Sequence, residues 1–174
     1  MGFLFSVNDA SKIMRERTLE VLVYLFDHYI DEWQDWGADL EDVEIELLGA
    51  GFGEKEINSA FLWLEGLLVA SEREGLESIF EDTLKLTRVY VTEERIRLGQ
   101  AGESLLNRLF EIGVLSLSSR EMVIDRVMEL GLPSLSLDYI KWIVLLVLNN
   151  QPGEGALTGY VESLVNNDSP RLLH

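Results

Sequence analysis

The amino-acid sequence predicts a mainly α-helical protein, a multi-helix bundle with helix-turn-helix-like units and at most one or two short strands. Apolar residues recur at spacings of three and four along most of the chain, a pattern typical of helices with one buried side. Glycine-containing turns separate these periodic stretches. The apolar run Trp142–Leu148 is shorter than the roughly 20 residues that cross a bilayer, so we expect other helices to enclose it.

Three helices are predicted in the first half of the chain. The first runs from about residue 17 to residue 33, and its apolar stripe comprises Leu22, Leu25, Phe26, Tyr29 and Trp33. Asp39 is the expected N-cap of the second helix, which ends at Gly49 and Gly51. The third begins at Gly53 or Glu54, and its apolar face comprises Ile57, Ala60, Phe61, Leu64, Leu67 and Leu68. The last two helices have the spacing of a helix-turn-helix or ubiquitin-associated unit.

The second half begins with residues 87–91, whose alternation and β-branched content predict a short strand or an extended arm. Thr92 is expected to cap the next helix, which ends at Gly113. A capping box is predicted at Ser118 and Glu121 for the helix that follows.

The most apolar helix is predicted at residues 137–148, with Ser134 or Ser136 as its cap. A last short helix is expected at residues 156–165. Four regions follow from this pattern: an N-terminal extension at 1–17, an acidic helical unit at 18–71, a linker at 72–87, and a helical unit at 88–174 around the core helix.

The charge of the chain is concentrated in its first half. The sequence has 31 acidic and 14 basic residues, and its net charge is −17. Residues 27–82 hold 17 acids and 2 bases, whereas residues 85–141 hold 8 of each. A field of this sign attracts basic partners and repels phosphate backbones.

The residue types of the sequence do not point to catalysis. There are two histidines and no cysteine, and no serine, histidine and acid form a recognisable triad motif. Asp27 with Asp31 and His28 with Glu32 stand four residues apart, so each pair shares a helix face; without further ligands we favour a solvated acidic face over a metal site. We therefore expect no enzyme, no cofactor and no metal ion.

Two groups of residues are candidates for contact with a partner. The acidic group comprises Trp36, Asp39, Glu41, Asp42 and Glu44, with the tryptophan as an aromatic anchor. The second group comprises Arg88, Tyr90 and Arg95. Arg88 and Tyr90 are suited to reading an RNA base or a phosphate, but arginines here are equally suited to docking the two halves through the carboxylates of the first half. We favour docking, because carboxylates are abundant.

Several fragments together resemble the bacterial Smg family. They are VLVYLFDHYI at 21–30, AGF at 50–52, FLWLEGL at 61–67, RVYVTEE at 88–94, SREMVIDRV at 119–127, LDYIKWIVLLVLNNQPG at 137–153 and LLH at 172–174. The resemblance covers roughly residues 18–174 and implies a bacterial, cytoplasmic protein. The family is a domain of unknown function, and the resemblance supplies no activity, cofactor or catalytic residue.

Charge and fold together predict a non-enzymatic adaptor or regulator. Its acidic unit is expected to bind a basic protein partner, such as a nucleic-acid-binding protein, or itself to mimic nucleic acid. The alternative is a helix-turn-helix-type nucleic-acid-associated protein that uses the arginines of the second half. Direct nucleic-acid binding is the less favoured, because the first half lacks the Lys and Arg residues that it requires. No association with a membrane is expected.

Overall fold

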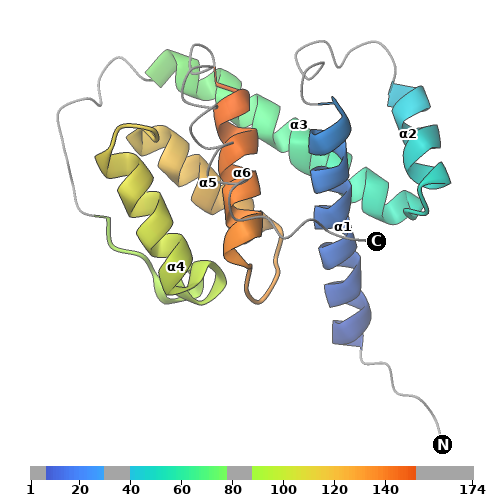
Figure 1. Ribbon diagram of the computed structural model, residues 1–174, viewed down its shortest axis with the longest axis horizontal. Helices are drawn as coiled ribbons and strands as arrows, with labels where there is room; N and C mark the ends of the chain where they lie inside the picture. Colours follow the sequence, from blue (N-terminus) through green and yellow to red (C-terminus); the bar gives the residue numbers. More distant parts are fainter. Residues whose placement is uncertain (1–6, 30–39, 78–87, 152–174) are drawn as a thin grey trace, which may run out of the picture. The chain divides into compact units, whose positions relative to one another are not determined.

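The computed structural model describes residues 7–29, 40–77 and 88–151 of the protein (Figure 1). These residues form six helices: α1 (Val7–Tyr29), α2 (Leu40–Gly49), α3 (Glu54–Glu77), α4 (Thr92–Glu111), α5 (Leu117–Glu129) and α6 (Leu137–Asn149). No strand occurs in these three ranges. The prediction of a mainly α-helical bundle is therefore confirmed. The predicted helix at 156–165 lies outside the described residues.

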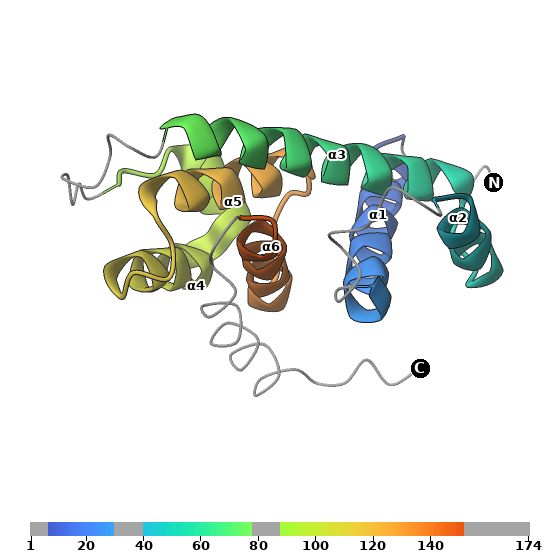
Figure 2. The same ribbon diagram turned by 90° about the horizontal axis from the view of Figure 1, so that it is seen from above.

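The chain divides into two compact units, Met1–Glu65 and Gly66–His174. The boundary falls within α3, which Figure 2 shows as one continuous helix. The predicted linker at 72–87 overlaps the end of this helix, because α3 continues to Glu77. Three glutamates and one leucine, residue types that favour helical backbone, lie in this last part of α3 at residues 72–77. Residues 78–87 lie outside the described part of the chain.

In the first unit, α1 starts at Val7, well before the predicted start near residue 17. The prediction followed apolar periodicity, which is weak at the start of α1. The side chains there still favour a helix, and Lys12 and Glu16 form an ion pair of 3.7 Å one turn apart. The apolar stripe of α1 is buried as predicted at Leu22, Leu25 and Phe26.

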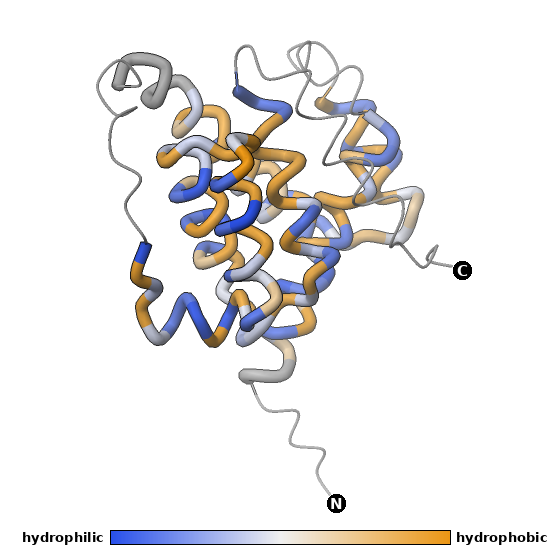
Figure 3. Tube along the Cα trace, turned by 60° about the vertical axis from the view of Figure 1, so that its left-hand side comes forward, coloured by the Kyte–Doolittle hydropathy of each residue, from blue (hydrophilic) through white to orange (hydrophobic). Residues whose placement is uncertain are grey.

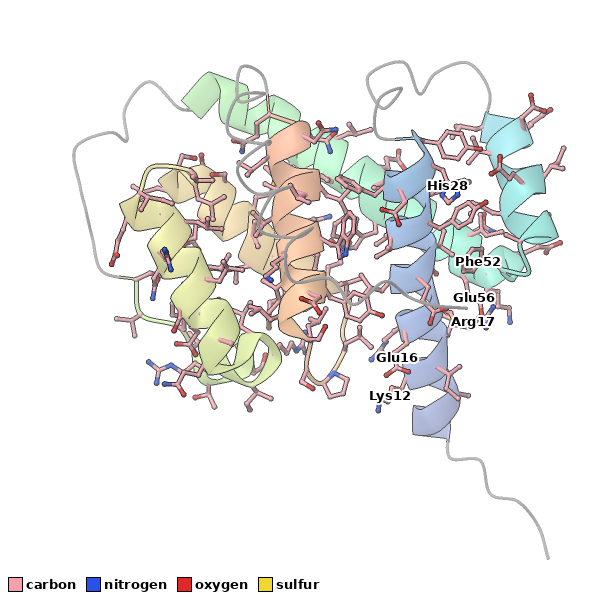
Figure 4. All side chains as sticks on the ribbon, in the orientation of Figure 1. Lys12, Glu16, Arg17, His28, Phe52 and Glu56 are labelled. Atoms are coloured by element: carbon pink, nitrogen blue, oxygen red, sulfur yellow. The ribbon has the colours of Figure 1, made fainter. Side chains whose placement is uncertain are left out.

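Arg17 connects α1 to the turn between α2 and α3, as Figure 4 shows together with Phe52 and Glu56. Its Nη2 donates to the carbonyl oxygen of Gly51 at 3.0 Å, and its Nε lies 3.2 Å from Oε1 of Glu56. Gly51 has a φ of 95°, a conformation that glycine adopts without strain. The predicted end of the second helix at Gly49 is confirmed.

In the second unit, α4, α5 and α6 pack against one another. Helix α6 is the most apolar of the three. Figure 3 shows the hydropathy of each described residue along the chain. Its buried residues include Ile140 and every position from Ile143 to Leu148. The expectation that other parts of the fold enclose this helix is confirmed. Its cap is Ser136, whose Oγ accepts a hydrogen bond from the backbone of Tyr139.

Two predicted helix starts need correction. Helix α4 is capped at Val91 instead of Thr92, and the carboxylate of Glu94 accepts the Val91 N–H at 3.0 Å. Helix α5 is capped by Ser116 instead of Ser118. The Ser116 Oγ accepts from the Ser119 N–H at 3.0 Å, and the Ser119 Oγ accepts from the Ser116 N–H at 2.7 Å. The two serines satisfy each other's exposed donors, so the predicted capping role of Glu121 is not needed.

The sequence did not predict a break inside α4. Gly99 has φ 63° and ψ 170°, so the helix is interrupted there. Two hydrogen bonds link Arg97, next to the break, to the end of α5 and the loop after it: the Leu135 N–H donates to the Arg97 carbonyl at 2.9 Å, and Arg97 Nη1 donates to the carbonyl of Met128 in the last turn of α5 at 2.6 Å. The Leu135 bond gives the Arg97 backbone carbonyl a partner outside α4 beside the break.

Candidate functional site

Helix α2 presents an exposed face on which apolar and acidic side chains alternate. Ile45 is 66% exposed and Leu48 is 42% exposed. Glu41 stands four residues before Ile45 and seven before Leu48, so the three lie on one side of the helix. Glu44 flanks this strip on one side and Asp42 on the other. We call these five residues the α2 face.

Among the residues that the structure describes, no cation pairs with the carboxylates of the α2 face. No Lys, Arg or His of the described ranges lies within ion-pair distance of Glu41, Asp42 or Glu44, and α2 itself contains no basic residue. Glu41 and Asp42 are exposed, and Glu44 is half-buried. Their charge is therefore directed to solvent or to a partner. Trp36 and Asp39, the other members of the predicted acidic group, lie outside the described residues.

The remaining carboxylate of α2, Glu46, is bonded to α1. It accepts a hydrogen bond from the Tyr24 hydroxyl at 3.0 Å and another from the Tyr29 hydroxyl. These two hydrogen bonds lower the pKa of Glu46, the Tyr29 bond contributing most. His28 stacks on the Tyr24 ring at 4.0 Å between centroids, and its Nδ1 lies 2.8 Å from the Tyr24 carbonyl oxygen. This arrangement, near His28 in Figure 4, fixes α2 on α1 and leaves the α2 face outward.

In the second unit, the segment before α4 is held by Arg88. Its Nη1 and Nη2 donate to the two carboxylate oxygens of Glu94 at 2.6 and 3.0 Å. Its Nε and Nη2 donate to the two oxygens of Glu121 at 2.5 and 2.7 Å. These bonds raise the pKa of Arg88 and lower the pKa of Glu94. We name Arg88, Glu94 and Glu121 the arginine clasp.

Tyr90 lies beside the clasp and is buried. Its ring centroid is 4.8 Å from the Arg88 guanidinium carbon, and its hydroxyl donates to Oδ1 of Asn107 at 2.9 Å. Burial raises the pKa of Tyr90. Arg120 is also buried and stacks over the Phe110 ring at 4.2 Å. Tyr90 therefore anchors the extended segment and presents no ring face suited to stacking on a nucleic-acid base.

The contacts of Arg88 differ from both sequence-based interpretations of this residue. Both carboxylates that bind it belong to the second unit, so it does not pair with the acidic residues of the first half. Its donors are also occupied, which leaves few for a phosphate. Arg95 is exposed and, among the described residues, has no ion-pair partner. No pattern in the local sequence identifies Asn107 as the partner of Tyr90 or Glu121 as a partner of Arg88.

The structure shows no group of three metal-ligating residues among those it describes. Of the two pairs weighed on the first helix, Asp31 and Glu32 lie outside the described ranges. Nor is any helix of the described segments long and apolar enough to span a membrane.

Comparisons with known proteins place the chain among bacterial relatives. A family model described as "Protein of unknown function (DUF494)" matches residues 18–174. The chain is 38% identical over 161 residues to a "Protein Smg homolog" of Nitrosococcus oceani, covering 92% of this chain and 100% of that protein. It is 39% identical to the homolog of Stenotrophomonas maltophilia strain K279a with the same coverage, and 37% identical to that of Vibrio cholerae over 90% of this chain and 99% of that protein. No solved structure matches the chain.

Proposed function

The chain belongs to the bacterial Smg family, described as of unknown function (DUF494), and on this premise we propose that it is a non-enzymatic adaptor or regulator that binds a basic protein partner. The binding surface is the α2 face of the acidic unit. The proposal also places the protein in the bacterial cytoplasm, and its partner class includes nucleic-acid-binding proteins.

The observation that supports this proposal is the different use of charge in the two units. The carboxylates of the α2 face have no cation within the described residues, whereas several cations of the second unit pair with carboxylates of that unit. Arg88 binds Glu94 and Glu121, Arg126 lies 2.6 Å from Glu129, and Lys141 lies 3.7 Å from Asp138. An uncompensated acidic surface attracts basic proteins and accelerates their association at low salt.

The test is affinity capture from a bacterial lysate at low salt with the full chain as bait. The variant E41Q/D42N/E44Q removes three charges from the α2 face. The control variant E93Q/E111Q/D125N removes three charges from exposed positions of the second unit. We expect the first variant to lose basic proteins that wild type and control both retain, as identified by mass spectrometry. Equal capture by all three proteins contradicts the assignment of the α2 face.

The alternative function, direct nucleic-acid binding through the second unit, has less support. Arg88 is bonded to two carboxylates and Tyr90 is buried, so Arg95 is the exposed member of that predicted group. A gel shift at low salt distinguishes the two functions. Tight binding that is lost in Arg95→Gln favours nucleic-acid binding over the adaptor proposal.

A further inference from the structure

We infer that the partner presents a basic amphipathic helix to the α2 face, with an apolar seam against Ile45 and Leu48 and Lys or Arg residues against the flanking carboxylates. This inference rests on the proposed function, because it names the chemistry of the same partner. It adds an apolar requirement that a simple charge attraction does not have.

The apolar part of the inference comes from the exposure of Ile45 and Leu48. They stand three residues apart on one side of α2, and Glu41 lies on the same side. Aliphatic side chains this exposed and this close together, rimmed by charge, are typical of a surface that a partner covers. A helix packs well on such a strip because its own apolar residues recur at the same spacings of three, four and seven.

The partner is expected to be basic, because acidic side chains surround the apolar strip formed by Ile45 and Leu48. Glu41, Asp42 and Glu44 flank the two apolar side chains and have no cation among the described residues. A partner helix that buries Ile45 and Leu48 brings its own flanks next to these carboxylates. Lys and Arg at those flanks combine an aliphatic stem that covers apolar surface with a cation that meets the acid.

The rest of this chain does not provide such a helix. The segments outside the described residues are 1–6, 30–39, 78–87 and 152–174, and each contains at most one Lys or Arg. A second copy packed face to face brings the same carboxylates against one another, which is unfavourable for a chain of net charge −17. Nucleic acid is repelled for the same reason. The occupant that fits is a different protein with a basic helix.

The experiment uses two fluorescein-labelled peptides of identical composition, made of leucine, lysine and alanine and long enough for about five helical turns. One places its leucines on one helical side, and the other is scrambled so that they are dispersed. Binding to the full chain is measured by fluorescence anisotropy at low salt. We expect the amphipathic peptide to bind at least tenfold more tightly than the scrambled one.

Two variants separate the contributions of the α2 face. I45S/L48S is expected to remove the preference for the amphipathic peptide, while V89S/I96S, which alters two exposed aliphatic residues of the second unit, retains it. E41Q/D42N/E44Q is expected to weaken the binding of both peptides at least tenfold, while E93Q/E111Q/D125N is expected to weaken their binding less. Circular dichroism confirms that each variant keeps its helices.

The outcomes distinguish failure of this inference from failure of the proposed function. If the peptides bind equally, or I45S/L48S keeps the preference, while the acid variant still weakens binding, the amphipathic helix is wrong and the basic partner stands. If neutralising the α2 carboxylates changes binding no more than the control does, the proposed function fails as well. A wild-type dimer that I45S/L48S converts to a monomer, measured by light scattering, identifies a second copy as the occupant and also overturns the inference.

Discussion

At the scale of single residues, the guanidinium of Arg88 donates to Glu94 at the start of α4 and to Glu121 in α5. Arg88→Gln removes the cation between these two carboxylates and leaves them facing each other. Because charged hydrogen bonds contribute more than neutral ones, we expect the free energy of unfolding to fall by about 2–3 kcal/mol in urea denaturation. Arg95→Gln, which alters an exposed arginine of α4, is the control and should change the free energy of unfolding by less than about 0.5 kcal/mol.

Glu94 also makes the stability of the second unit depend on pH. Its hydrogen bonds to Arg88 hold its pKa in the folded protein below the ordinary value of 4.5. The stabilisation by Glu94 is therefore complete above the unfolded pKa and is lost as pH falls through the lower folded pKa. Wild type should exceed Glu94→Gln in free energy of unfolding by about 2 kcal/mol at neutral pH and by much less near pH 3. A difference that stays constant over this range contradicts an ionised clasp.

The sequence analysis singled out Arg88 and Tyr90, but it did not predict the contacts that these two residues make. Their partners Glu94, Asn107 and Glu121 lie up to 33 residues away and are brought close by the packing of α4 and α5. Local patterns contain no information on such pairings. In the first unit, likewise, the Tyr24 and Tyr29 hydroxyls donate to Glu46, which distinguishes it from Glu41, Asp42 and Glu44, three carboxylates with no cation among the described residues. Charge counting alone treats all four as equal.

At the scale of the helices, prediction succeeded where one signal dominates. Gly113 and the apolar run of α6 each have a clear local meaning, and the structure agrees. The start of α5 had two competing signals, because the sequence offers serines at 116 and 118. Glu121, which completes the predicted box, is bonded to Arg88 instead, and the box therefore forms between Ser116 and Ser119. The cap at Ser116, in place of Ser118, is thus found together with the contact between Arg88 and Glu121, which lie 33 residues apart.

The break in α4 is a feature that a single substitution can test. Gly99 has a φ of 63°, and a Cβ there meets no atom within 4 Å, so the cost of Gly99→Ala is conformational. With ψ at 170° this is a region essentially restricted to glycine, and we expect a loss of about 1–3 kcal/mol in the free energy of unfolding. Gly49→Ala is the matched control, since Gly49 also has open space but no positive φ. That control should be neutral or slightly stabilising; equal effects of the two substitutions mean that α4 is not broken at Gly99 in solution.

At the scale of the whole molecule, the uneven charge has a cost for stability as well as a use in binding. Residues 27–82 carry 17 acids and 2 bases, and like charges at this density repel one another in the compact state. The α2 face adds to this repulsion, because no cation of the described residues compensates it. Binding of a basic partner to the α2 face, as proposed above, relieves this repulsion. The same carboxylates should therefore govern both binding and salt-dependent stability.

Salt tests this connection directly. The Debye length falls from about 30 Å at 0.01 M to about 8 Å near physiological ionic strength, so added sodium chloride screens the repulsion between exposed carboxylates. The ion pairs of Arg88 are partly buried and are screened less. We therefore expect the Tm of the wild-type chain to rise by about 2–4 °C between these salt concentrations, which corresponds to about 1 kcal/mol.

The variant E41Q/D42N/E44Q should begin with a higher Tm at low salt and gain less from added salt, because part of the repulsion is already removed. E93Q/E111Q/D125N removes the same charge from the second half, where residues 85–141 hold 8 acids and 8 bases, and it should give a smaller increase. Thermal unfolding followed by circular dichroism measures all three proteins. A wild-type Tm that is insensitive to salt, or an equal gain in both variants, indicates that the acidic unit is already compensated. The same result removes the physical basis for recruiting a cationic partner to α2.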